Sequence, residues 1–170
     1  MSPIINFLKF HNPSQGELLF GQVLKEIVDF MKADRQAKYR VMIGSDSNGH
    51  GSLDVVSVVA IHRVGNGGRY FWHRTAKAGI KTLRQKIYAE VEMSLELAAL
   101  FLPAFRKELG RVINQTELPF DFQIHVDVGE MGETRDLIRE VTSMVRGYGY
   151  EVFVKPDSAA ATSFADRHVR

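Results

Sequence analysis

The sequence predicts one α/β domain, built on a mixed five-stranded sheet that is flanked by helices. Three observations support this fold class. The chain has 170 residues, enough for one sheet and its covering helices. Hydrophobic residues make up 45% of it, which is enough for a sizeable core. The apolar periodicity alternates between strand and helix spacing, and after an N-terminal helix it gives the order β-β-β-α-β-α-β-α.

Residues 1–38 are predicted to form an N-terminal helical extension that packs on the domain of residues 39–170. Ser14 and Glu17 have the spacing of a capping box. Apolar residues then recur at helical spacing as far as Met31, so we expect an amphipathic helix of about 18 residues.

Turn signals separate the later elements. The apolar run VMIG ends in the turn residues SDSN, and Asn66-Gly67 between two β-rich runs indicates a hairpin. Gly147 and Gly149 mark the end of a later helix. We expect strands at residues 40–46, 54–63, 69–75, 120–128 and 151–154, and helices at residues 80–108, 132–146 and 158–168.

Composition and motifs exclude several classes of site. The chain has no cysteine, which removes disulfide scaffolds, Cys-ligated zinc, iron–sulfur clusters and thiol nucleophiles. No HExxH, GxSxG, GxGxxG or Walker loop is present. No window reaches the roughly 18 apolar residues of a membrane span, and the N-terminus lacks a signal-peptide pattern. We therefore expect a cytoplasmic protein without a membrane partner.

Positive charge is concentrated in one segment, although the formal net charge is only +2. No Asp or Glu occurs between Val55 and Ala89, and aromatic residues such as Trp72 are interleaved with the cations. Cations bind phosphates and flat rings stack on bases, so the segment predicts a nucleic-acid surface. The alternative is a strand whose aromatics enter the core while its cations face solvent. The cations expected to contact nucleic acid are Arg69, Arg74, Lys77, Lys81, Arg84 and Lys86.

Three carboxylates follow strands that are expected to be neighbours. Asp46 and Asp127 end two predicted strands, and Asp157 directly follows the last one. If these strands are parallel neighbours, the acids lie at the carboxyl edge of the sheet, where ligand sites in open α/β sheets collect. Each acid also has a structural interpretation, as a turn residue or, for Asp157, as a helix N-cap.

Glu90 falls in the apolar stripe of the long helix. At about 100° per residue it lies about 20° from Leu83, whereas Glu92 and Glu96 lie on the opposite face. An unpaired buried carboxylate is costly, so Glu90 needs a salt bridge or a metal. Two-metal phosphoryl transfer requires several carboxylates around hard ions about 4 Å apart, and these acids could supply them.

Four sequence blocks together are specific: GSDS at 44–47, LRQKIYAEVEMSLELA at 83–98, HVDVGEMGETRDLI at 125–138 and KPDSAAATSFADRH at 155–168. They resemble the YkuK-like family of predicted RNase H-like nucleases, whose fold has the same order of elements. The resemblance implies a catalytic acidic cluster of Asp46, Glu90 and Asp127 that binds metal. The fourth acid stays open: Asp157 lies at the strand exit, whereas related nucleases often carry their last acid inside the final helix, where Asp166 lies.

Two functions are compatible with these patterns. The first is a nuclease that depends on Mg²⁺ or Mn²⁺ and cleaves phosphodiester bonds of RNA, DNA or a hybrid by a two-metal carboxylate mechanism. The alternative is a non-catalytic nucleic-acid-binding module of RNase H-like fold, in which the acids make structural bonds. His125 shares a strand face with Asp127, and we expect it to be a hydrogen-bonded strand residue rather than a metal ligand.

Overall fold

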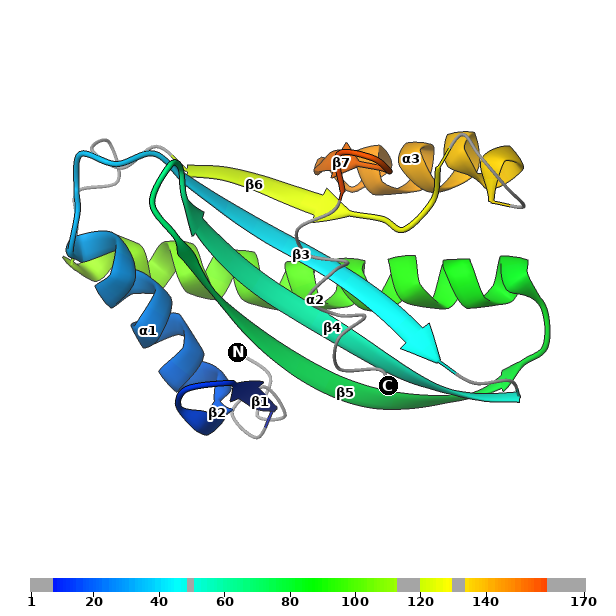
Figure 1. Cartoon of the computed structure of the whole chain (residues 1–170), viewed down its shortest axis with the longest axis horizontal. Helices are drawn as coiled ribbons and strands as arrows, with labels where there is room; N and C mark the ends of the chain where they lie inside the picture. The colour runs from blue at the N-terminus through cyan, green and yellow to red at the C-terminus, as the bar shows by residue number, and fades with distance from the viewer. Residues whose placement is uncertain (1–7, 49–50, 113–119, 130–133, 159–170) are drawn as a thin grey trace.

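A seven-stranded mixed sheet organises the computed structural model, which describes residues 8–48, 51–112, 120–129 and 134–158 (Figure 1). The strands lie in the order β2-β1-β5-β4-β3-β6-β7. The predicted α/β fold class is confirmed. The predicted number of five strands is wrong, because two strands come from the N-terminal segment.

Three long antiparallel strands form the centre of the sheet: β3 (Tyr39–Asn48), β4 (Gly51–Arg63) and β5 (Gly68–Ile80). The predicted hairpin between β4 and β5 is confirmed, and Gly67 adopts the positive φ of 75° that its tight turn requires. The strand β5 continues to Ile80, beyond the predicted end at residue 75, because it pairs with β4 almost throughout.

Two parallel strands extend the sheet beyond β3. The strand β6 (Phe120–His125) pairs with β3, and β7 (Glu151–Phe153) pairs with β6. The helix α3 (Ile138–Gly147) is the crossover between them, and a short 3₁₀-helix at Arg135–Leu137 precedes it. The helix predicted for residues 132–146 is therefore shorter in the described part of the chain.

The N-terminal segment forms a β-hairpin where the sequence predicts the start of a helix. The strands β1 (Lys9–Asn12) and β2 (Gly16–Leu19) pair antiparallel, and β1 also pairs with β5. The helix α1 begins only at Phe20 and continues to Lys32. The predicted helical spacing is confirmed, because the six buried residues of α1 recur at that spacing from Phe20 to Met31.

The capping box predicted at Ser14 is wrong because Ser14 lies in the hairpin turn. The Asn12 side chain accepts hydrogen bonds from the backbone N–H groups of Ser14 and Gln15, at 2.9 and 3.1 Å, which forms an Asx-type turn. At the true start of the helix, the Leu19 N–H donates to the Gln22 side chain at 2.7 Å.

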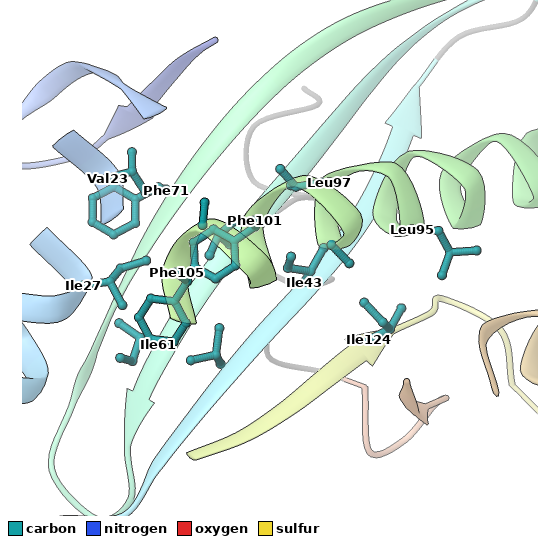
Figure 2. Close-up of a cluster of buried hydrophobic side chains, with 14 of the residues drawn as sticks. Val23, Ile27, Ile43, Ile61, Phe71, Leu95, Leu97, Phe101, Phe105 and Ile124 are labelled. Carbon is teal, nitrogen blue, oxygen red and sulfur yellow. The ribbon is translucent and has the colours of Figure 1, made fainter. Parts of the chain in front are cut away.

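The helices α1, α2 (Leu83–Val112) and α3 contribute to one hydrophobic core with the same face of the sheet. Figure 2 shows Phe101 and Phe105 of α2 close to Ile27 of α1 and to Ile61 and Phe71 of the sheet. The two α2 rings stack with centroids 5.2 Å apart. Burial of such large rings is a major part of the driving force for folding.

Side chains alternate along β3, so the polar residues at its end point to two opposite faces of the sheet. Val41 and Ile43 belong to the core under the helices, so Ser45 and Ser47 also point to the helix side. Met42 belongs to a second apolar cluster with residues of β4, and Asp46 shares that opposite face. None of the described helices is long and apolar enough to cross a membrane.

Candidate functional site

The candidate site lies where β3 and β6 separate. Their parallel pairing ends with Gly44 opposite His125, while β3 continues alongside β4. Asp46 and Asp127 each follow this last pair by two residues. The fold therefore brings both strand-end acids to the same edge of the sheet.

Glu90 reaches this edge from the helix α2. It is only 6% exposed, whereas Glu92 and Glu96 are exposed, as the helical phase predicts. The Ser47 hydroxyl donates to the Glu90 Oε1 atom at 2.6 Å, and the Lys86 ammonium lies 3.9 Å from the same oxygen. Glu90 is thus a buried carboxylate with a hydrogen bond and a distant counter-charge.

The ionisation of Glu90 depends on both strand-end acids. Burial is the main cause that raises the pKa of Glu90, to about 7, and the hydrogen bond from Ser47 opposes it. The charge of Asp46 raises this pKa further, Lys86 lowers it, and Asp127 raises it. The structure therefore brings Asp46, Glu90 and Asp127 into one electrostatic neighbourhood.

Asp127 forms an ion pair that was not predicted. The Lys155 Nζ atom lies 2.5 Å from the Asp127 Oδ1 atom, and the Asp127 side chain is 27% exposed. The Oδ1 atom itself is buried and has no aligned hydrogen-bond donor in the described structure. No local pattern in the sequence could have shown this pair, because it depends on the register of β6 with β7.

A layer of buried serines lies between α2 and the sheet, and the sequence analysis missed it. The Ser94 hydroxyl donates to Ser45 at 2.9 Å, and Ser45 shares a hydrogen bond of 2.8 Å with Ser57. The available signals were the alternation in GSDS and the four-residue spacing of Glu90 and Ser94, which puts both on one helix face. This polar layer fixes the position of α2, and hence of Glu90, over the end of β3.

The acids as placed do not enclose an ion, since no group of three or more His, Asp or Glu residues in the described chain is arranged to hold one. Their chemistry still fits a hard divalent cation. All three donors are carboxylates, one is buried with its pKa raised to about 7, and another has a buried oxygen without an aligned donor. Lys86 and Lys155 compensate two of the three charges.

Of the two candidates for the fourth acid, the structure describes only Asp157. Asp157 is exposed in the turn after β7, where its backbone N–H donates to the Val154 carbonyl at 2.9 Å. Asp166 lies outside the described residues, as does the predicted final helix beyond Ser158.

The six predicted phosphate contacts do not gather on one face. Alternation along β5 puts Arg74 on the face of Asp46 and puts Arg69 and Lys77 on the helix side. Lys81 is exposed, without an ion pair to a described residue. The ion pairs of the other five are Arg69–Glu26 at 2.7 Å, Arg74–Asp54 at 3.3 Å, Lys77–Glu92 at 3.1 Å, Arg84–Glu140 at 2.7 Å and Lys86–Glu90 at 3.9 Å.

His125 is a hydrogen-bonded strand residue. It is 3% exposed, its Nδ1 atom lies 3.0 Å from the Ser158 carbonyl oxygen, and its Nε2 atom lies 3.2 Å from the Gln123 Oε1 atom. Burial lowers its pKa, and the Ser158 hydrogen bond opposes this shift. Both ring nitrogens therefore lie within hydrogen-bonding distance of a protein oxygen.

Comparison with known proteins agrees with this fold. A sequence model of the Ribonuclease H-like family matches residues 22–170, so the chain belongs to the Ribonuclease H-like family. It is also 31% identical, over 173 residues, to a Bacillus subtilis (strain 168) protein named Uncharacterized protein YkuK. The aligned region covers 95% of this chain and 96% of that relative. No solved structure matches the chain.

Proposed function

We propose that this protein is a nuclease that cleaves phosphodiester bonds with Mg²⁺ or Mn²⁺ held by Asp46, Glu90 and Asp127. The observation that carries the proposal is that these carboxylates lie in one electrostatic neighbourhood where β3 and β6 separate, with one of them buried. Family membership supports a function in nucleic-acid chemistry, and the all-oxygen donor set supports a hard divalent cation.

The residues of the site would have different roles. When bound, divalent cations supply an activated water and neutralise charge on the phosphate. Ser47 orients the buried Glu90, while Asp46 and Asp127 are partly exposed and could be reached by a substrate. The exposed ion pairs of the basic segment are each worth less than about 1 kcal/mol, so their cations can exchange a carboxylate for a phosphate at little cost.

Asp166 is the better candidate for the fourth acid. Asp157 is exposed in the turn after β7, whereas the family resemblance favours an acid inside the final helix, where Asp166 lies. Converting each of the two to Asn separates the alternatives, because loss of the true ligand lowers Mn²⁺ affinity by about tenfold or more, as measured by calorimetry.

A cleavage assay tests the proposed activity. We expect purified protein with Mn²⁺ to cleave at least one of labelled RNA, DNA and hybrid substrates, and Asp46→Asn to reduce the rate at least about 100-fold. The matched control is Asp54→Asn, because Asp54 lies on the same sheet face but forms an exposed pair with Arg74. Failure to cleave any of the three substrates, or equal rates for the two variants, would contradict the proposal.

The second candidate is a nucleic-acid-binding module without catalysis. One observation favours it: two of the three acids are already paired with lysines, and the described acids do not enclose an ion. In that case Mn²⁺ has no calorimetric site, while nucleic acid still binds with an affinity that falls steeply with salt. Mn²⁺ binding that is lost in Asp46→Asn would exclude this alternative.

A further inference from the structure

Lys155 places an ammonium group at one of the three acids because of the register of the parallel strands. His125 of β6 lies opposite Phe153 of β7, so Asp127 and Lys155 are each two residues further along neighbouring segments. The Lys155 N–H donates to the Val128 carbonyl at 2.8 Å, which continues the pairing past the strand ends. The fold itself therefore sets the 2.5 Å ion pair.

Gly129 leaves room for the Lys155 side chain. A Cβ atom at Gly129 would lie 3.1 Å from the Lys155 Cβ atom and 3.8 Å from its Cδ atom, and the first distance is tighter than ordinary packing. The lysine stem thus runs close along this backbone before its ammonium group meets Asp127. A side chain at position 129 would push that stem away.

The two site lysines differ in how they pair. Lys86 lies 3.9 Å from a Glu90 oxygen that already accepts the Ser47 hydroxyl. Lys155 lies 2.5 Å from an Asp127 oxygen with no aligned donor, and its side chain is 58% exposed. Lys155 is therefore the lysine that would compete directly with a metal ion for a carboxylate. Its exposed side chain can also move away from Asp127 into solvent.

We propose that Lys155 is a displaceable counter-ion, which neutralises Asp127 until a divalent cation takes that carboxylate. The released ammonium group then stays beside the acids, where it pairs with a phosphate of the nucleic acid. This inference rests on the proposed function, because it assigns the divalent cation to Asp127. The inference couples two binding events, because binding of the divalent cation frees Lys155 to contact a phosphate.

Calorimetric titration with Mn²⁺ tests the displacement. The variants are Lys155→Met, Lys155→Arg and the control Lys25→Met, which removes an exposed lysine–aspartate pair of 2.8 Å on α1, remote in sequence from the acids. We expect Lys155→Met to bind Mn²⁺ about fivefold more tightly than wild type and the other two to stay within about twofold. Affinity no tighter than that of Lys25→Met would overturn the inference.

A second titration tests the released ammonium group. Fluorescence anisotropy of a short labelled RNA, and of DNA with the same sequence, is measured with Ca²⁺ to keep both strands intact. We expect Lys155→Met to bind the preferred strand about fivefold more weakly than Lys25→Met does. Equal affinity overturns the phosphate contact.

The outcomes separate this inference from the proposed function. If wild type binds Mn²⁺ and Lys155→Met binds it no more tightly, only the inference fails. If neither binds Mn²⁺, both fail. If Lys155→Met alone binds Mn²⁺, the inference is supported. Thermal unfolding by circular dichroism verifies that each variant is folded, which we expect because the Lys155 side chain is largely exposed.

Discussion

At the scale of single residues, Glu90 makes stability depend on pH in a direction opposite to that of most carboxylates. Its pKa rises from the ordinary value of 4.5 to about 7 in the folded protein, mainly through burial. Between these two values the folded state keeps a proton that the unfolded state has lost. The contribution of Glu90 to stability is therefore full below about pH 4.5 and is lost as the pH rises through about 7.

Glu90→Gln should remove this pH dependence, because an amide stays neutral. Without divalent ions, we expect the variant to match wild type near pH 4.5 and to exceed its free energy of unfolding by up to about 3 kcal/mol above pH 7. Urea unfolding across this range measures the difference. Glu92→Gln, on the exposed face of the same helix, serves as the control and should show no such trend. A constant difference between Glu90→Gln and wild type at all pH values would show that Glu90 does not titrate in this range.

Some residues of the site could be predicted and others could not, for physical reasons. The burial of Glu90 follows from helical phase alone, and the positions of Asp46 and Asp127 follow from strand ends. Lys155 requires the register of β6 with β7, which is set by tertiary pairing rather than by local pattern. Ser47 requires knowledge of which face of β3 the long helix covers.

At the scale of elements, the N-terminal hairpin and α1 share a core with the sheet. Phe20, the first residue of α1, is 1% exposed. Its ring centroid lies 6.2 Å from that of Phe10 in β1 and 6.5 Å from that of Phe101 in α2, in an edge-on arrangement with the latter. One side chain thus connects the hairpin, α1 and α2. The domain boundary at residue 38 stays a prediction.

Phe20→Ala should therefore destabilise the whole protein. Deleting a buried ring leaves a cavity at the meeting of three elements, so we expect a loss of about 3 to 5 kcal/mol in the free energy of unfolding. The matched control is Leu19→Ala, one residue earlier, where the side chain is 45% exposed and the change should be within about 0.5 kcal/mol. Denaturant unfolding followed by circular dichroism measures both. A separate early transition in Phe20→Ala, instead of one shifted transition, would mean that the N-terminal segment unfolds independently.

The hairpin also shows why this element was missed. The run from Ser14 to Met31 has helical spacing, but residues 16–19 have too few positions to distinguish a strand from a helical turn. The deciding interactions are the Asx-type turn at Asn12 and the pairing of β1 with β5, of which the second is non-local. Long-range pairing overrides local propensity there.

At the scale of the whole molecule, the three acids come from three elements that are far apart in sequence. β3, α2 and β6 each supply one carboxylate, and the buried serines hold α2 against the sheet. The basic segment, in contrast, is divided between the two faces of β5, and most of its cations pair with acids of other elements. Charge runs in a sequence do not reveal this division, because strand alternation and tertiary pairing decide it.

A cation bound by these acids should connect the three elements and stabilise the fold in a pH-dependent manner. Glu90 must lose its proton to bind metal, so we expect Mg²⁺ affinity to be about tenfold weaker near pH 6 than near pH 8. At about 100 times the dissociation constant, bound Mg²⁺ adds about 2.7 kcal/mol to the free energy of unfolding. Thermal unfolding with and without Mg²⁺ at both pH values measures this, with Glu90→Gln as the control that should lose most of the effect. Equal stabilisation of wild type at the two pH values would contradict a role for Glu90 as a ligand. The expected result places the strongest effect of the metal above pH 7, where the buried charge of Glu90 destabilises the metal-free protein most.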